Sequence, residues 1–231
     1  MDNDAICERL ANVQRVKNMS LLVDSHHYIV LSYLYDWLEN AAAHAARGIL
    51  LDYSCGGQPY RDLFSSKIER YIAADIAAAA DTTPDLTFLP GERLALPDHS
   101  VDTILSTQVL EHVPDHCFYL VECRRLLKLG GNLIITVPMQ WRHHEVPFDY
   151  LRFTRFGISQ CLTKLGFHIE DLRPCGGVYA LLGQIFASHL DEAGMRRKWI
   201  FRLINRLALF LDRKCPDYED TLGWMCIAKK S

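Results

Sequence analysis

The strongest constraint on the fold is an apolar run that ends in an acid and a glycine-containing turn. Residues 49–57 read Ile-Leu-Leu-Asp-Tyr-Ser-Cys-Gly-Gly, and a second apolar run, 71–75, also ends in an acid, Asp75. Each run is typical of a buried strand, and in a β-α-β unit both strands end at the same edge of the sheet. A backbone turn would then lie beside a carboxylate, where a ribose can bind. The pattern therefore indicates a nucleotide-like cofactor.

The composition favours an intracellular α/β protein. Of the 231 residues, 49% are hydrophobic, which is enough for a sizeable core. The formal net charge of -3 gives no general reason to expect nucleic acid as a partner. The eight cysteines form no Cys-x-x-Cys pair, so buried thiols in a reducing compartment are expected rather than disulfides or a zinc site.

The N-terminal residues 1–4 are acidic and lack the basic-then-apolar order of a signal peptide. No stretch reaches the roughly 18 uncharged apolar residues that a membrane span needs. We therefore expect a cytoplasmic protein.

Hydrophobic periodicity predicts strands that alternate with helices, which implies a parallel sheet covered on both faces. Gly and Pro mark most of the boundaries. The predicted strands are 49–53, 68–74, 86–89, 101–106, 132–137, 167–173 and 222–228. The predicted helices are 5–18, 26–46, 60–66, 115–129 and 154–165, with 77–85 as a loop and about forty helical residues between the last two strands.

Five ordered motifs carry a family resemblance. They are Leu-Asp-Tyr-Ser-Cys-Gly at 51–56, Asp75, Leu-Pro-Asp-His-Ser-Val-Asp at 96–102, Val-Leu-Glu-His-Val at 109–113 and Arg-Leu-Leu-Lys-Leu-Gly-Gly at 125–131. Their order and spacing resemble the class I S-adenosylmethionine-dependent methyltransferases, of the type 11-like, small-molecule or glycan-modifying subgroup. The resemblance covers roughly residues 48–172.

This resemblance implies a Rossmann-like, seven-stranded, mostly parallel sheet with helices on both faces and an antiparallel last strand. It implies one methyltransferase domain over 1–231, with S-adenosylmethionine over the carboxyl ends of the strands. Within it we expect N-terminal helices or a lid at 1–47, the cofactor core at 48–173, a helical insertion at 174–217 and the last strand at 218–231.

The same resemblance implies which residues bind the cofactor. Asp75 matches the acid that holds both ribose hydroxyls, and a carboxylate has two acceptor oxygens suited to a diol. The predicted cofactor-binding residues are Asp52, Ser54, Gly56, Asp75, Gly91, Glu92, Thr107 and Gln108.

The chain departs from the family pattern at the turn. Ser54 and Gln58 stand where the family usually has glycine, and only Gly56 is kept. Ser54 can still turn tightly if its φ is negative. Gln58 either crowds the cofactor carboxylate or donates a hydrogen bond to it. Pro90 occupies the place of an acid that the family often has near the adenine, so Glu92 or backbone near Gly91 would have to substitute.

The segment 141–154 follows the fifth predicted strand and is dense in titratable groups. Methyl transfer to a hydroxyl is helped by a base, and His has a suitable unperturbed pKa of about 6.5. His144 is the first candidate and His143 the second, while Glu145 or Asp149 could orient the imidazole or act as the base. Tyr150 and Arg152 are predicted to bind the acceptor.

Other roles for these groups stay open. Glu145, Asp149 and Arg152 could instead fix a long loop through ion pairs. A divalent metal shared by His143, His144, Glu145 and Asp149 is not expected, because adjacent residues of an extended segment point apart. Glu111 and His112 follow the fourth predicted strand, where structural roles are favoured.

Residues 195–214 contain seven Lys or Arg against one Asp. An apolar stripe at helical spacing accompanies them: Ile200, Leu203, Ile204, Leu207 and Leu211. We expect this helix to pack on the sheet through that stripe. The alternatives are contact with an anionic membrane surface or with a second copy of the chain.

The predicted function is S-adenosylmethionine-dependent methyl transfer to a small molecule or glycan, with oxygen as the accepting atom and without a metal. One alternative is a methyltransferase fold that serves as a binding or regulatory protein. Another is methylation of nitrogen, but no Asn-Pro-Pro-Tyr-like tetrapeptide follows the fourth predicted strand, where Ser106-Thr107-Gln108-Val109 stands.

Overall fold

The computed structural model describes residues 21–76 and 83–231. The predicted helix 5–18 and most of the predicted loop 77–85 lie outside these residues. The strands are β1 (Ile49–Tyr53), β2 (Arg70–Ile76), β3 (Leu86–Phe88), β4 (Val101–Thr107), β5 (Leu127–Pro138), β6 (Phe167–Pro174) and β7 (Gly223–Lys230). The helices are α2 (Tyr28–His44), α3 (Arg61–Ser65), the 3-10 turn η1 (Leu110–His112), α4 (His116–Leu126), α5 (Arg155–Lys164), α6 (Val178–Glu192) and α7 (Lys198–Lys214).

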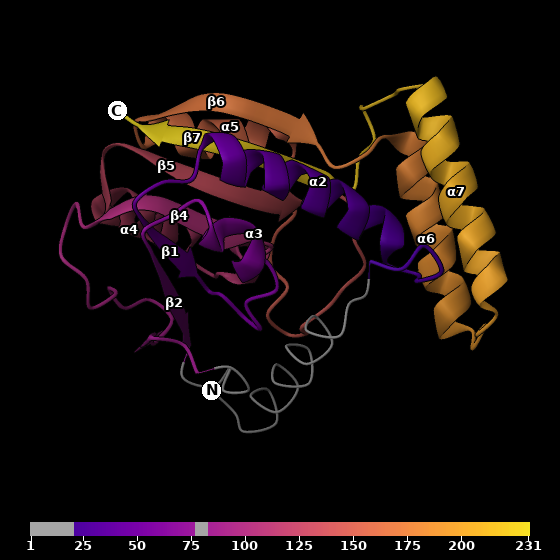
Figure 1. Ribbon diagram of the computed structural model, residues 1–231, viewed down its shortest axis with the longest axis horizontal. Helices are drawn as coiled ribbons and strands as arrows, with labels where there is room; N and C mark the ends of the chain where they lie inside the picture. Colours follow the sequence, from indigo (N-terminus) through magenta and orange to yellow (C-terminus); the bar gives the residue numbers. More distant parts are fainter. Residues whose placement is uncertain (1–20, 77–82) are drawn as a thin grey trace.

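The described strands form one seven-stranded sheet in the order β3-β2-β1-β4-β5-β7-β6 (Figure 1). All pairs from β3 to β5 are parallel, whereas β7 runs antiparallel to both β5 and β6. This confirms the predicted sheet and its antiparallel last strand. Because β1, β2, β4 and β5 are parallel, their carboxyl ends meet at one edge, where ligands bind in sheets of this type.

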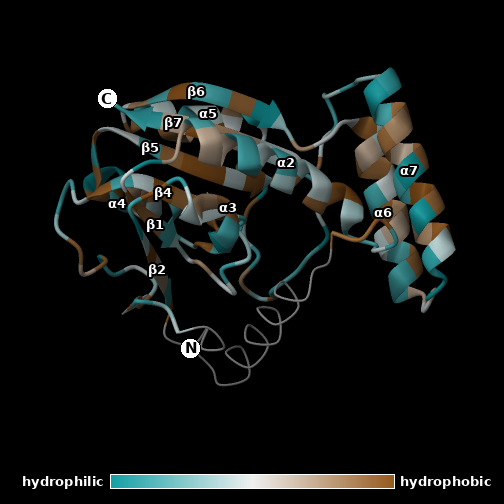
Figure 2. Cartoon of the chain, viewed as in Figure 1, coloured by the Kyte–Doolittle hydropathy of each residue, from teal (hydrophilic) through white to brown (hydrophobic). Residues whose placement is uncertain are grey.

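Two cores lie on opposite faces of the sheet, and neighbouring strand residues alternate between them. Leu50 packs with α2 and α3, while Leu51 packs with α4 and α5. Ile104 and Leu105 divide in the same way. Strands buried on both faces explain the continuous apolar runs in the sequence (Figure 2).

The helix predicted at 115–129 is shorter than its pattern indicated. Asp115 caps α4 as expected, since its carboxylate accepts a hydrogen bond from the backbone N–H of Phe118. The helix ends at Leu126 because Leu127 already pairs with Val101 in the sheet. Gly130 and Gly131, which could end a helix predicted to reach residue 129, lie inside β5 instead.

The helical excursion between the last strands is a hairpin of α6 and α7 beyond the end of the sheet (Figure 1). The close approach of the two helices depends on Gly183, where an added Cβ would lie 2.4 Å from the Cβ of Ala208. The hairpin packs against α2. The expected packing of residues 195–214 on the sheet is therefore wrong.

The stripe that α7 buries also differs from the predicted one. Its buried residues are Phe201, Asn205, Ala208 and Asp212. Asp212 accepts hydrogen bonds from the backbone N–H groups of Gly177 and Ala180 at the start of α6, and Asn205 donates to carbonyls of the segment before α2. Because these polar groups need partners, they determine which face is buried. Of the predicted stripe, Leu203 and Leu207 are exposed, and Ile200, Ile204 and Leu211 are half-buried.

Among the described residues, none of the helices combines the length and the apolar character that crossing a membrane requires.

Candidate cofactor and acceptor site

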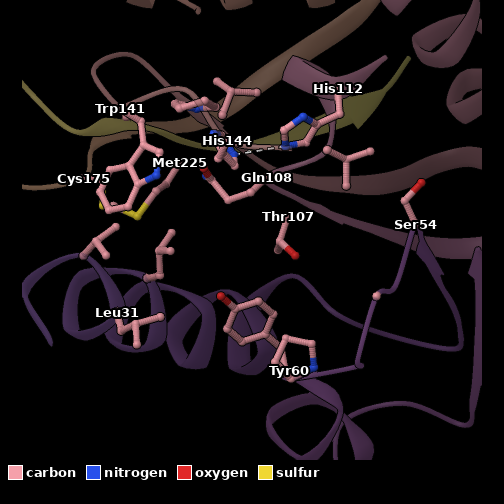
Figure 3. A pocket seen from close by; sticks show the side chains of 18 of the residues that line it. Leu31, Ser54, Tyr60, Thr107, Gln108, His112, Trp141, His144, Cys175 and Met225 are labelled. Carbon is pink, nitrogen blue, oxygen red and sulfur yellow. Dashed lines mark hydrogen bonds between the residues drawn. The ribbon is translucent and has the colours of Figure 1, made fainter. Parts of the chain in front are cut away.

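A pocket opens over the carboxyl ends of β1, β2, β4 and β5 (Figure 3). One part of its wall is the turn after β1 together with Asp75, and another is the loop after β5 with His144 and Glu145. Helix α2 contributes apolar side chains, including Leu31 and Leu34. The remaining wall includes Tyr60, Thr107, Gln108, His112, Trp141, Cys175 and residues 222–225.

The turn after β1 adopts a conformation that explains why relatives favour glycine there. Ser54, Gly56 and Gln58 have φ values of 67°, 50° and 54°, so all three lie in the left-handed region. The condition of a negative φ at Ser54 is therefore not met. A side chain in this region is strained by roughly 1 to 2 kcal/mol. The turn thus keeps its shape at an energetic cost at two positions.

The side chain of Gln58 does not line the pocket. Its Oε1 accepts a hydrogen bond of 2.7 Å from the Nη1 of Arg61, at the start of α3. The glutamine that replaces a family glycine is thus directed to α3, and the turn beside the pocket is made by Ser54, Cys55, Gly56 and Gly57.

Asp75 joins the end of β2 to the turn after β1. Its Oδ2 accepts a hydrogen bond of 2.6 Å from the backbone N–H of Gly56, and its Oδ1 accepts one of 2.7 Å from Ile76. Both carboxylate oxygens of Asp75 therefore accept main-chain hydrogen bonds. Asp75 lines the pocket and is buried.

Asp52 lies behind the pocket lining at the end of β1 and is 3% exposed. The Tyr71 hydroxyl donates a hydrogen bond to its Oδ2. Burial raises the pKa of Asp52 to about 7, and the Tyr71 hydrogen bond opposes this rise. Asp52 is therefore placed to support the turn rather than to contact a ligand in the pocket.

The other predicted cofactor residues divide into two groups. Gly91 and Glu92 are exposed and do not line the pocket. Thr107 and Gln108 do line it, and Gln108 has a φ of 53°. Its backbone N–H and its side-chain Nε2 both hydrogen-bond to Thr136 on β5, which holds this conformation.

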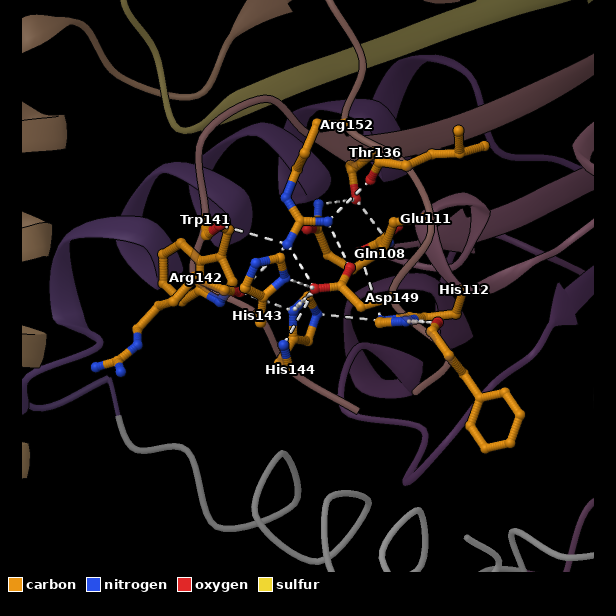
Figure 4. Close-up of polar contacts among 12 residues, drawn as sticks. Gln108, Glu111, His112, Thr136, Trp141, Arg142, His143, His144, Asp149 and Arg152 are labelled. Carbon is orange, nitrogen blue, oxygen red and sulfur yellow. Dashed lines mark hydrogen bonds and ion pairs between the residues drawn. The ribbon is translucent and has the colours of Figure 1, made fainter. Parts of the chain in front are cut away.

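The acceptor side of the pocket contains two facing imidazoles (Figure 4). The Nε2 atoms of His112 and His144 lie 3.1 Å apart. The Nδ1 of His112 lies 2.8 Å from the carbonyl of Phe148, and the Nδ1 of His144 lies 3.2 Å from the carbonyl of Arg142. Burial, together with the charge of His112, lowers the pKa of His144, which favours its neutral form at pH 7.

Glu111 lies behind this histidine pair and is fully buried. Among the described residues, neither of its carboxylate oxygens has a hydrogen-bond partner. Burial raises its pKa to about 8, which the charge of Arg152 only partly offsets. Its backbone carbonyl accepts a hydrogen bond of 2.8 Å from Tyr150, so η1 anchors the loop that carries His144.

Asp149 and Arg152 form a bidentate pair at 2.5 and 2.7 Å (Figure 4). Arg152 also donates to the carbonyls of Trp141 and Arg142. Burial alone would raise the pKa of Asp149, but the Arg152 hydrogen bonds hold it well below its usual range. The pair fixes the loop, and neither residue lines the pocket.

The sequence-predicted acceptor residues are only partly brought together. The side chain of His143 is 90% exposed, and Tyr150 is 45% exposed; neither lines the pocket. Of the four residues weighed as a shared metal site, the Nδ1 atoms of His143 and His144 each lie 3.5 Å from Asp149 Oδ2, but Asp149 is already paired with Arg152. His144 and Glu145 remain as the pocket-facing members.

The sequence did not assign several lining residues. The sequence favours a structural role for His112. Its position in the Val-Leu-Glu-His-Val motif is the one sequence feature that points to the pocket. Tyr60, Trp141 and residues 222–225 reach the pocket through the tertiary fold, and no local pattern marks them. The ring of Trp141 stacks on that of His27, which joins the acceptor loop to the start of α2.

A family model described as a methyltransferase domain matches residues 51–135, which run from β1 to β5. This stretch contains the turn, Asp75, η1 and the strand ends that form the pocket. The matched stretch is therefore similar to a methyltransferase domain, in agreement with the resemblance that the ordered motifs carry.

Two curated relatives give the sequence context. A probable S-adenosylmethionine-dependent methyltransferase of Mycolicibacterium smegmatis is 28% identical over 143 residues, covering 56% of each chain. A ubiquinone biosynthesis O-methyltransferase of Cereibacter sphaeroides is 33% identical over 96 residues, covering 37% of this chain and 39% of that protein. The match thus spans about half of the first relative's length and 39% of the second relative's length.

The fold is similar to that of 1,6-didemethyltoxoflavin-N1-methyltransferase of Burkholderia thailandensis, whose structure contains S-adenosylhomocysteine. The TM-score is 0.54 with 14% identity, and the match covers 88% of this chain and 78% of that one. The family model and the names of the two sequence relatives support S-adenosylmethionine as the cofactor. The O-methyltransferase and the N1-methyltransferase differ in the methylated atom, so the fold alone does not identify the acceptor.

Proposed function

We propose that this protein transfers a methyl group from S-adenosylmethionine to an oxygen atom of a small molecule or glycan. The observation that carries the proposal is the single pocket that joins Asp75 and the β1 turn to the imidazole of His144. A cofactor and an acceptor can meet in such a pocket without crossing the protein.

The residues of the cofactor half fit S-adenosylmethionine. We assign Asp75 to the ribose hydroxyls, because it lines the pocket and the two oxygens of a carboxylate suit a diol. The backbone of Ser54 and Gly56 curves around the space beside it, and Thr107 and Gln108 lie where the methionine portion would extend. Gly91 and Glu92 are exposed and would need to approach to reach the adenine. The bound cofactor supplies an electrophilic methyl group.

The acceptor half supplies the groups that receive a hydroxyl. The acceptor oxygen forms a bond to the methyl carbon as the carbon–sulfur bond breaks, and the hydroxyl proton must leave. His144 stays our first candidate to take that proton, and the carboxylate of the next residue, Glu145, also lines the pocket. Asp149 and Arg152 position His144, because the His144 backbone N–H donates to Asp149 at 3.1 Å.

Calorimetry with S-adenosylmethionine tests the enzyme proposal against a fold that has become a binding or regulatory module. We expect one molecule of cofactor to bind per chain. Absence of binding by the pure protein would overturn the proposal. Product analysis with hydroxyl-bearing and amine-bearing acceptors then separates oxygen from nitrogen methylation.

The neighbouring histidines provide a matched pair of variants for the acceptor half. We expect His144→Ala to slow turnover by about 100-fold, within the range for loss of one acid–base group, while cofactor binding stays nearly unchanged. His143→Ala, which changes an exposed side chain one residue away, should be close to the parent. Equal turnover of both variants would contradict the assignment of His144.

We further propose that the α6–α7 hairpin contacts an anionic membrane surface on the cytoplasmic side, where an amphiphilic acceptor would be presented. Each helix leaves an apolar stripe at the surface, and every side chain in it is more than half exposed. The stripes consist of Leu182, Ile185 and Phe186 on α6 and Trp199, Leu203, Leu207 and Phe210 on α7. The seven basic residues of 195–214 match anionic lipid, while the one acid, Asp212, is buried.

Sedimentation with vesicles tests this contact. We expect binding to vesicles that contain phosphatidylserine and little binding to phosphatidylcholine vesicles. Replacing Leu203 and Leu207 with Ser should remove it, since both side chains are exposed and their loss spares the core. A dimer by gel filtration that the same double variant dissociates would instead show that a second copy covers this face.

A further inference from the structure

Three side chains converge at the acceptor end of the pocket from two segments that are distant in sequence. Glu111 and His112 come from η1 after β4, and His144 comes from the loop after β5. One ligand atom from each of the three lies within 4.8 Å of the others. His112 and His144 line the pocket, whereas Glu111 lies behind them and is fully buried.

The backbone determines which nitrogen of each imidazole carries the hydrogen. A carbonyl oxygen can only accept, so His112 Nδ1–H donates to Phe148 and His144 Nδ1–H donates to Arg142. In the neutral rings, both Nε2 atoms then present lone pairs. These two atoms face each other at 3.1 Å. Two lone pairs this close repel each other, and a cation or a shared proton beside both nitrogens would relieve the repulsion.

Glu111 adds a third electron-pair donor to the same point. Its Oε1 lies 3.8 Å from the Nε2 of His112. Both carboxylate oxygens are buried, and within the described parts of the chain neither accepts a hydrogen bond. A buried carboxyl group without partners is costly, and native structures seldom retain one without an unplaced ion or water. The three side chains are therefore arranged to bind a positively charged ligand.

We propose that Glu111, His112 and His144 bind one divalent transition-metal ion at the acceptor end of the pocket. Ligand atoms about 2.1 Å from a common ion stand roughly 3 to 3.5 Å apart. The 3.1 Å separation of the two imidazole nitrogens lies within this range, and the 3.8 Å separation of Glu111 from His112 is slightly longer. The carbonyls that receive both Nδ1–H groups are the outer partners that metal-binding histidines usually have.

The set of two imidazoles and one carboxylate also indicates the kind of ion. Nitrogen ligands favour Mn²⁺, Fe²⁺, Co²⁺ or Zn²⁺ over Mg²⁺ or Ca²⁺, which prefer oxygen. Three protein ligands leave coordination positions open toward the pocket. An acceptor hydroxyl placed there would lose its proton more readily, and His144 would then be a ligand rather than the base. Binding of the ion does not rest on the proposed function; only this use of it does.

Titration with Mn²⁺ alone tests the site. Mn²⁺ is preferable to Zn²⁺ because the chain has exposed cysteines, Cys117 and Cys215, which attract Zn²⁺. The full chain is first dialysed against a chelator, and calorimetry is run without cofactor or acceptor. We expect one equivalent to bind to the parent and to His143→Ala, and no measurable binding to Glu111→Gln or His144→Gln.

Two controls keep the result interpretable. Glu111→Gln replaces a buried carboxylate with a group of nearly the same shape, and its binding of S-adenosylmethionine reports on folding. If it fails to fold, His144→Gln decides, because His144 is only partly buried. Absence of Mn²⁺ binding to the parent would overturn the proposal in favour of a shared proton. Equal binding by the parent and both ligand variants would overturn it as well.

Discussion

The two halves of the pocket use different parts of the polypeptide. In the cofactor half, the shape comes from the main chain of the β1 turn, and the Asp75 side chain holds it through Gly56. In the acceptor half, the chemistry comes from side chains of η1 and the loop after β5. The first half therefore tolerates changes of side chain that leave the backbone path intact. In the acceptor half, a change of side chain removes a reactive group itself.

This difference explains where the chain can depart from its family. Ser54 and Gln58 keep left-handed backbone conformations, and the Gln58 side chain turns toward Arg61. The change at each position therefore costs strain without blocking the pocket. By contrast, the position of His144 depends on hydrogen bonds to Asp149 and on the tie between Tyr150 and Glu111. Replacing Asp149 would remove the first of these supports, whereas the second joins main-chain groups.

The largest effect on cofactor binding is expected at Asp75, whose side chain holds the turn after β1. Asp75→Ala should weaken S-adenosylmethionine binding by about 100-fold (~3 kcal/mol), since it loses charge-assisted hydrogen bonds to the ribose and releases Gly56. Asp75→Asn keeps an acceptor for Gly56 and should lose less. Calorimetry measures both. Equal affinity of Asp75→Ala and the parent would show that the turn alone binds the cofactor.

A large loss of stability is expected in the acceptor half when Asp149 is changed. Asp149→Asn leaves the guanidinium of Arg152 without its bidentate partner, and we expect the free energy of unfolding to fall by about 2 to 3 kcal/mol. Denaturant unfolding measures this change. The double variant Asp149→Asn/Arg152→Met, which removes both charges, should recover part of the loss. A neutral effect of the single change would mean that the pair does not hold the loop.

Asp52 should make stability depend on pH. Its pKa is about 7 in the folded chain and near 3.8 when unfolded, so the folded state holds the proton more tightly. This contribution is fully present below about pH 4 and is lost as the pH rises to about 7. Asp52→Asn avoids the loss, and its gain over the parent should be larger at pH 8 than at pH 5 by about 2 kcal/mol. Urea unfolding at the two pH values tests this, and a constant difference would contradict it.

The smallest effect is expected from the strained turn. Gln58→Gly should stabilise the protein by about 1 kcal/mol by relieving a left-handed residue, even though the bond to Arg61 is lost. Gly56→Ala, at a φ of 50°, should destabilise it by a similar amount. Thermal unfolding compares them. A loss of stability in Gln58→Gly would mean that the contact with α3 outweighs the strain.

Local patterns predicted most of the architecture. Continuous apolar runs predicted six of the seven strands to within two residues at each end, because strands buried on both faces are continuously apolar. The exception is β5, which begins five residues before the predicted strand 132–137. Asp115 marked the start of α4 through its cap. The end of that helix was misplaced because the pairing of Leu127 with Val101 overrode the glycine signal. The stripe of α7 was misassigned because Asp212 and Asn205 have partners that no local pattern reveals.

The sequence by itself determined the order of strands and helices, the turn after β1, and the acids Asp52 and Asp75, because these depend on periodicity and on spacing within one β-α-β unit. Only the tertiary structure decided which titratable groups meet. It turned His143 to solvent, paired Asp149 with Arg152, and brought His144 to within 3.1 Å of His112, thirty-two residues away in sequence. The physical reason is that parallel strands carry distant segments to one edge, and the distances between side chains there depend on loop paths that hydrogen bonds fix.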